Sequence, residues 1–360
     1  METTRRERQA VVQWFEEHGL APHDQGRVFC RPPPRGRPCV GGVQLNQVVG
    51  DTMIRSISYA TYRHRDLAAV RTFFEDFGLV VAHETPDRIF FRGCNDAPYL
   101  YIAERAEESS FVGVAFEVDS EESLQVLSAR LGAPIEDLDY PGGGRRVATM
   151  DPDGRKIELV HGVARVAPIA VSRPPVAWNS AGERRRLGRF PIFDVGPAEV
   201  IALKHVVMSS PNPVAIIEWF TEKLGAFPSD LIGETKEKAI GAFMRFPRGA
   251  EYVDHHNIAV FLGPTNGAHH VCFETIDLDA IGVGRRYLAS KGYKASWGLV
   301  RHSLGGAVSD YWYDPSGFRV EHVTDGDFLN DTYPTRLNPH NQESLEQWGT
   351  MVMPEDFLRS

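Results

Sequence analysis

Strands and helices alternate along most of this chain, as the spacing of its apolar residues indicates. Residues 54–79, IRSISYATYRHRDLAAVRTFFEDFGL, first alternate apolar and polar positions and then change to a helical period that ends near a glycine. Residues 200–226, VIALKHVVMSSPNPVAIIEWFTEKLGA, repeat this pattern. We therefore expect a strand, a short loop and a helix in each of two places.

Two further pairs of stretches extend this internal repeat. SFVGVAFEVDS at 110–120 matches AHHVCFETID at 268–277, since both alternate as strands do and end in an acid. TMDPDGRKIELVHG at 149–162 matches WYDPSGFRVEHVTDG at 312–326, each an Asp-Pro-x-Gly turn followed by a strand with a glutamate. The predicted fold class is α+β, with duplicated βαβββ modules in two tandem domains, each a curled mixed sheet.

Proline-rich and glycine-rich stretches divide the chain. CRPPPRGRPC lies in an N-terminal extension that begins with a predicted amphipathic helix, and VSRPPVAWNSAGERRRLGRFP separates the two repeats. The predicted divisions are an extension at 1–53, a first domain at 54–170, a linker at 171–199, a second domain at 200–330 and a tail at 331–360.

Composition and charge exclude several classes of protein. No apolar run approaches the roughly 18 residues that a membrane span needs, and the N-terminus lacks the pattern of a secretory signal. The four cysteines show no CxxC spacing, which argues against a disulfide framework or a thiolate zinc site. A net charge of −9 opposes general nucleic-acid binding. These features predict a cytoplasmic protein with no membrane or nucleic-acid partner.

Comparing the two repeats separates candidate chemistry from structural residues. The alignment pairs Tyr59 with His205, Gly113 with His270, and Glu158 with Glu321. Only the second repeat places two histidines and a glutamate at the three matched strand positions. This ligand set suits a non-haem Fe(II) and leaves coordination positions open. Glu158, which lacks histidine partners, is interpreted as structural.

A family resemblance follows from the same residues. YWYDPSGFRVE, residues 311–321, resembles the Y-x-x-x-P-S-G-x-x-x-E signature of the type I extradiol ring-cleaving catechol dioxygenases of the vicinal oxygen chelate superfamily. The resemblance covers roughly residues 54–330. It implies Fe(II), or less often Mn(II), bound by the second half, with His205, His270 and Glu321 as its ligands.

The resemblance also implies three catalytic residues and a reaction. His256 fits the histidine that holds dioxygen and acts as acid or base, His302 fits a donor to a substrate oxygen, and Tyr311 fits the tyrosine that grips the catechol. The implied reaction opens the ring of a substituted catechol beside its diol to give a muconic semialdehyde, with both oxygen atoms entering the product. Aromatic catabolism and a homo-oligomer are implied as well.

Two other functions stay open on the same scaffold. One is a metal-dependent isomerase or lyase of the glyoxalase type, which uses no oxygen, and the other is a non-catalytic ligand-binding protein. The retained tyrosine and histidines, and metal ligation confined to one half, count against both.

Strand alternation assigns the adjacent histidines. It places His270 on the face of Cys272 and Glu274 and turns His269 to the opposite face, which makes His270 the expected ligand. His322 is expected to face away from the site and to be exposed, and His64 has no partners in the sequence that support a role as a metal ligand.

The identity of the catechol is open at this stage. Some resemblance to enzymes of the dihydroxy-cumate branch suggests a carboxylate or a bulky substituent. Arg245, Arg248 or Arg301 is a candidate partner for such a carboxylate. The extension and the tail are the segments that could cover the pocket mouth.

Overall fold

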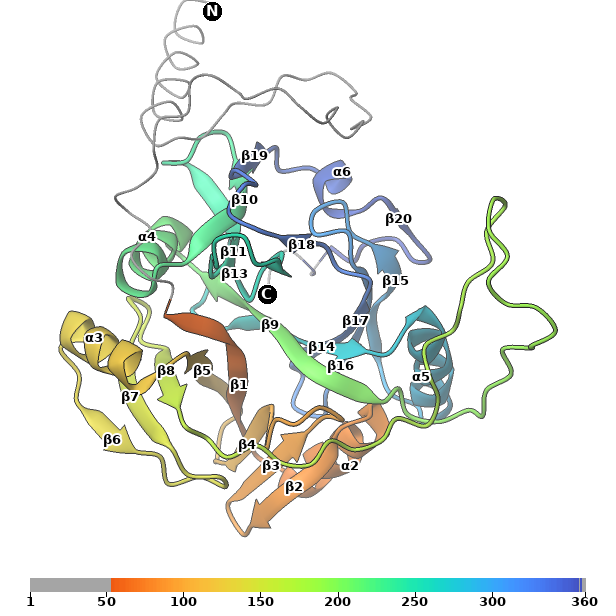
Figure 1. Ribbon diagram of the computed structural model, residues 1–360, viewed down its shortest axis with the longest axis horizontal. Helices are drawn as coiled ribbons and strands as arrows, with labels where there is room; N and C mark the ends of the chain where they lie inside the picture. The colour runs from red at the N-terminus through yellow and green to blue at the C-terminus, as the bar shows by residue number, and fades with distance from the viewer. Residues whose placement is uncertain (1–52, 356, 358–360) are drawn as a thin grey trace, which may run out of the picture.

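The computed structural model describes residues 53–355 and Phe357, and the predicted N-terminal helix lies outside this range. Each half of the chain is built from two βαβββ modules, so the described part contains four (Figure 1). The predicted fold class is confirmed, with a finer repeat than the sequence pattern indicated. Within the described residues, no helix has the length and apolar character needed to cross a membrane.

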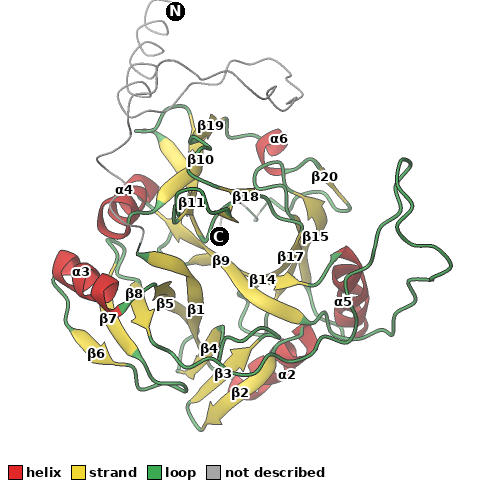
Figure 2. Ribbon diagram, in the orientation of Figure 1, coloured by secondary structure: helices red, strands yellow, loops and turns green. Residues whose placement is uncertain are grey.

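The first half forms one sheet of eight strands in the order β2-β3-β4-β1-β5-β8-β7-β6 (Figure 2). Its elements are β1 (Ile54–His64), α2 (Leu67–Phe77), β2 (Val80–Thr85), β3 (Arg88–Arg92), β4 (Tyr101–Arg105), β5 (Ser110–Val118), α3 (Glu121–Leu131), β6 (Ile135–Asp137), β7 (Arg145–Met150) and β8 (Lys156–His161).

The second half forms a sheet of ten strands in the order β19-β10-β11-β13-β9-β14-β17-β16-β15-β20. Its modules comprise β9 (Val200–Ser210), α4 (Pro213–Leu224), β10 (Phe227–Gly233), β11 (Ala239–Arg245), β13 (Ile258–Leu262), β14 (Ala268–Thr275), α5 (Leu278–Ser290), β15 (Ala295–Arg301), β16 (Val308–Tyr313) and β17 (Arg319–Thr324). A short pair, β12 (Val253–Asp254) and β18 (Phe328–Leu329), lies beside this sheet.

The tail adds to the second sheet. β19 (Arg336–Asn338) pairs with β10, and β20 (Trp348–Gly349) pairs with β15, with α6 (Gln342–Leu345) between them. Residues 171–199 extend away from both sheets beside α5 (Figure 1).

Local sequence explains why each module begins its helix where it does. Asp66, Ser120, Asn212 and Asp277 each accept a backbone N–H of the first helical turn, which satisfies a donor that would otherwise lack a partner. Apolar faces of the helices and sheets from both halves then merge into one core, in which Phe74 and Phe77 of α2 contact Phe273 of β14. The halves are therefore held by a shared core.

Candidate metal centre

Three neighbouring strands at the centre of the second sheet carry the candidate ligands. Cys272 of β14 lies opposite His205 of β9 on one side and opposite Glu321 of β17 on the other. His270 lies two residues before Cys272, on the same face of β14. The sheet register thus brings together three residues that are far apart in the sequence.

The ligand atoms of His205, His270 and Glu321 form a compact group. The Nε2 atoms of the two histidines are 3.3 Å apart, and Glu321 Oε2 lies 3.2 Å from His205 Nε2 and 3.0 Å from His270 Nε2. Three ligands at right angles, each about 2.1 Å from one ion, are about 3.0 Å apart. The spacing therefore fits one face of an octahedral metal ion such as Fe(II) or Mn(II).

The electrostatics of the group also fit a cation. Glu321 is 1% exposed, and its ion-pair partners among the described residues are the two histidines. Although burial opposes ionisation, His270 and His205 hold the pKa of Glu321 well below its usual range. Burial lowers the pKa of His270 to about 4, so this ring is neutral at pH 7 and has a lone pair to offer. A buried carboxylate beside a neutral imidazole needs a positive partner, which a divalent metal supplies.

The first half shows what the same positions look like without metal ligands. Tyr59, Ala115 and Glu158 lie in the register that His205, Cys272 and Glu321 occupy in the second half. The Tyr59 hydroxyl donates to Glu158 Oε2 over 3.2 Å, and Arg146 and Lys156 neutralise the carboxylate. Glu158 is thus part of a closed ion-pair network, in agreement with its structural interpretation.

The placement of His269 differs from the prediction. Strand alternation turns it away from the site, but the pairing of β14 with β9 shifts register between Ala268 and His270. A β-bulge of this kind re-aims side chains, so His269 is buried and lines the same cavity as His270, with the two Nδ1 atoms 2.6 Å apart. His269 stands outside the group of three close ligand atoms.

The three residues with implied catalytic roles surround this group. His256, in the loop between β12 and β13, packs its ring 4.1 Å from that of His205. Tyr311 of β16 lies opposite Glu321, and its hydroxyl is 2.8 Å from His302 Nε2. Burial, together with the charge of Glu321, raises the pKa of Tyr311 well above its usual value. The structure gathers the predicted residues around one cavity, while their roles stay predictions.

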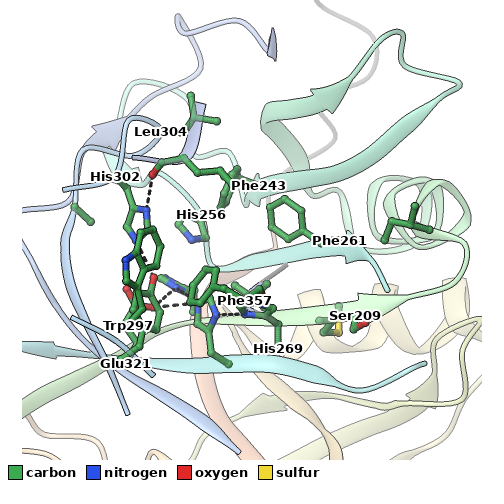
Figure 3. A pocket seen from close by; sticks show the side chains of 18 of the residues that line it. Ser209, Phe243, His256, Phe261, His269, Trp297, His302, Leu304, Glu321 and Phe357 are labelled. Atoms are coloured by element: carbon green, nitrogen blue, oxygen red, sulfur yellow. Dashed lines mark hydrogen bonds and ion pairs between the residues drawn. The ribbon is translucent and has the colours of Figure 1, made fainter. Parts of the chain in front are cut away.

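This cavity has a volume of about 250 Å³, and Figure 3 shows the side chains around it. Around the candidate ligands, the cavity wall is largely apolar and aromatic and includes Phe243, Phe261, Trp297, Leu304 and Phe357. Among the described residues that line it, none is lysine or arginine. The volume lies below the roughly 300–1,000 Å³ of drug-sized sites, so the cavity suits a small apolar molecule.

The tail forms part of this wall, which the sequence left open. The carbonyl of Phe357 contacts His269 Nε2, Trp297 Nε1 donates to the Met351 carbonyl, and His302 Nδ1 donates to the Leu345 carbonyl. The wall residues could not be identified from the sequence, because they come from separate strands, a loop and the tail.

Comparison with known proteins places this site in a family. Residues 202–322 match the model of the Glyoxalase/Bleomycin resistance protein/Dioxygenase superfamily. The chain is 28% identical over 311 residues to metapyrocatechase 2 of Cupriavidus necator, covering 85% of this chain and 92% of that protein. It is 24% identical over 283 residues to 3-methylcatechol 2,3-dioxygenase of Pseudomonas putida, covering 75% and 89%. Over most of its length, the chain is therefore similar to extradiol catechol dioxygenases.

A solved structure supports the fold. The Mn(II)-bound glyoxalase from Novosphingobium aromaticivorans aligns with a TM-score of 0.71 and 24% identity, over 86% of this chain and 95% of that one. At this level of identity, the comparison shows a shared fold.

The suggestion that Arg245, Arg248 or Arg301 pairs with a substrate carboxylate is not supported by the structure. The Arg245 guanidinium is buried against Ser229 and two backbone carbonyls, Arg248 pairs with Asp119, and Arg301 pairs with Asp325. None of these arginines lines the cavity.

The predicted exposure of His322 is wrong, and His64 has a similar environment. His322 does face away from the metal site, but it is fully buried, where its ring stacks on Phe77 and Nε2 donates to the Phe77 carbonyl. His64 is also fully buried, with its two ring nitrogens 2.8 Å from Ser316 Oγ and the Tyr101 hydroxyl. Both lie where the halves meet, a surface that the repeat pattern did not reveal.

Proposed function

We propose that the protein cleaves catechol, or a catechol with a small apolar substituent, by extradiol ring opening with dioxygen at an Fe(II) held by His205, His270 and Glu321. The observation that carries the proposal is the facial group of three ligands at one end of an apolar cavity that also contains His256, His302 and Tyr311. Mn(II) accepts the same ligands.

The metal ligands and the cavity wall have different roles in this proposal. When bound, Fe(II) supplies a redox-active centre that contacts both reactants and leaves protein groups to bind and orient them. His302 and Tyr311 form a hydrogen-bonded pair beside the ligands, suited to gripping a catechol oxygen. The aromatic wall excludes water and packs against the ring.

The wall also favours one class of substituent. A buried carboxylate needs a positive or hydrogen-bonding partner, and the arginines considered for this role are paired elsewhere. Relatives include a protein named for 3-methylcatechol, a substrate of the class that such a wall accepts.

Oxygen uptake by anaerobically purified, Fe(II)-loaded protein tests the proposal. Catechol and 3-methylcatechol are expected to consume one dioxygen per molecule and to give a yellow ring-opened product, while 3,4-dihydroxyphenylacetate reacts about 100-fold less efficiently. If the metal-loaded protein takes up no oxygen with any catechol, the dioxygenase proposal fails and the glyoxalase-type isomerase replaces it. If the carboxylated catechol reacts fastest, only the substrate class is wrong.

A further inference from the structure

A second cavity, of about 190 Å³, adjoins the apolar cavity in which the substrate is proposed to bind. The linings of the two cavities share His205, His256 and Ala307, so these side chains lie between them. The second cavity is bounded on its outer side by the loop after β17, where residues 325–327 are exposed. The candidate ligand His205 is therefore part of the wall of two different cavities.

Carboxylates determine the charge of this second cavity, called here the acidic cavity. The carboxylates in its lining are those of Asp254, Glu274, Asp325 and Asp327. Among the described lining residues, Lys204 supplies the one basic group besides histidine, and its Nζ contacts Asp254 and lies 3.7 Å from Glu274 Oε1. Arg301 pairs with Asp325, so four carboxylates face two cations and leave an excess of two negative charges.

A hydrated divalent cation distinguishes the acidic cavity from the substrate cavity. Between apolar walls, the ion loses water ligands that the walls cannot replace, which costs free energy. Carboxylate oxygens can replace those ligands, and their negative charge raises the local concentration of cations. The acidic cavity thus suits a divalent cation, whereas the substrate cavity suits an aromatic ring.

We propose that the acidic cavity is the route by which the divalent metal ion reaches and leaves its three ligands, separate from the path of the organic substrate. This inference rests on the metal site of the proposed function and on no property of the catechol. Among the described residues, the close group of three ligand atoms is that of His205, His270 and Glu321, and the acids of this cavity are not part of it. The cavity is therefore a passage to the metal centre and does not form a second one.

Gly326 is the position at which this passage can be narrowed. A Cβ there would lie 3.8 Å from the Cβ of Ala307, which is an ordinary contact, and Ala307 lies between the two cavities. A barrier on a route slows movement in both directions equally. We therefore expect Gly326→Phe to slow Fe(II) uptake and Fe(II) release by the same factor, about tenfold or more, and to leave the equilibrium affinity unchanged. Gly326→Ala, the matched small substitution, should keep both wild-type rates.

Two further variants test the charge and the location of the route. Asp327→Asn should slow Fe(II) uptake about threefold at low ionic strength and much less at high salt, because it removes an attraction that salt screens. Asp139→Asn is its control, since Asp139 is exposed in the first half and lines neither cavity. Leu304→Trp narrows the substrate cavity alone and should leave both Fe(II) rates unchanged.

Anaerobic mixing of metal-free protein with Fe(II) measures uptake, with the unbound ion trapped at intervals by ferrozine, and excess ferrozine added to loaded protein measures release. Wild-type rates in Gly326→Phe, or slowed rates in Leu304→Trp, would overturn the inference. Slower uptake of Fe(II) with weaker equilibrium binding would also overturn it, because the substitution would then act on the metal site itself.

The same measurements separate the route from the proposed function. If the wild-type protein binds no Fe(II), both the route and the metal centre fail. If Fe(II) exchange responds to Gly326→Phe as expected but the loaded protein cleaves no catechol, the route stands and the dioxygenase function fails.

Discussion

At the residue scale, the site depends on which of two adjacent histidines offers its Nε2 to the metal group. His270 Nε2 lies within 3.3 Å of both other ligand atoms, whereas His269 contacts His270 Nδ1 and the Phe357 carbonyl. His269 thus orients a ligand, as outer partners of metal-bound histidines commonly do. The choice of His270 as the ligand stays a prediction. The sequence misjudged the direction of His269, because a β-bulge has no signature in the alternation of apolar residues.

These contacts predict different metal contents for two variants. His270→Ala removes a ligand and is expected to purify without stoichiometric iron. His269→Ala is expected to retain iron after gel filtration but to release it to a chelator about tenfold faster or more, because His270 loses its orienting contact. Metal analysis before and after chelation checks both outcomes, and full iron in His270→Ala would move the ligand to another residue.

At the scale of elements, the internal repeat predicted the strands that carry the candidate metal ligands but not the segments that form the cavity wall around them. Aligning the matched strands paired Tyr59 of the first half with His205 of the second. The β-bulge is also present in both halves, since Thr61 pairs with Gly113 in the first as Val207 pairs with His270 in the second. The domain boundaries stay a prediction, although strands of the tail join the second sheet. Contacts between the tail and the cavity could not be predicted, because the prediction came from comparing the two repeats and the tail belongs to neither of them.

The tail is expected to contribute to substrate specificity. Phe357 is 6% exposed and packs against Trp297 and Tyr311, with ring centroids 4.6 and 5.0 Å away. Phe357→Ala should raise KM for 3-methylcatechol about tenfold and change KM for catechol less, because the lost wall faces apolar substituents. Steady-state oxygen uptake with both substrates provides the comparison. A tenfold change confined to kcat would show instead that the tail acts on the chemical step.

At the scale of the whole molecule, buried histidines connect the two halves. Burial lowers the pKa of His322 and of His64 to about 4, while an unfolded histidine titrates near 6.5. Between these values the unfolded chain binds more protons, so the stability that these residues support is present above pH 6.5 and is lost as the pH falls toward 4.

Removing one of these groups should weaken the dependence of stability on pH. In His322→Gln, the amide can still donate to the Phe77 carbonyl, but the site no longer titrates. Wild type should lose up to about 1.4 kcal/mol per pH unit more than the variant between pH 6.5 and 4. Urea unfolding across this range measures the difference, with His83→Gln at an exposed position as the control. Parallel curves for wild type and His322→Gln would remove His322 from acid sensitivity.

The packing of the first half also makes it difficult to introduce a metal site at the positions that match the ligands of the second half. Any side chain at Gly113, the counterpart of His270, would place its Cβ 1.8 Å from the Lys156 carbonyl oxygen. A histidine therefore cannot fit there without moving the neighbouring strand, and Glu158 already accepts a hydrogen bond from Tyr59. No single substitution in the first half can therefore create a second metal centre like that of the second half.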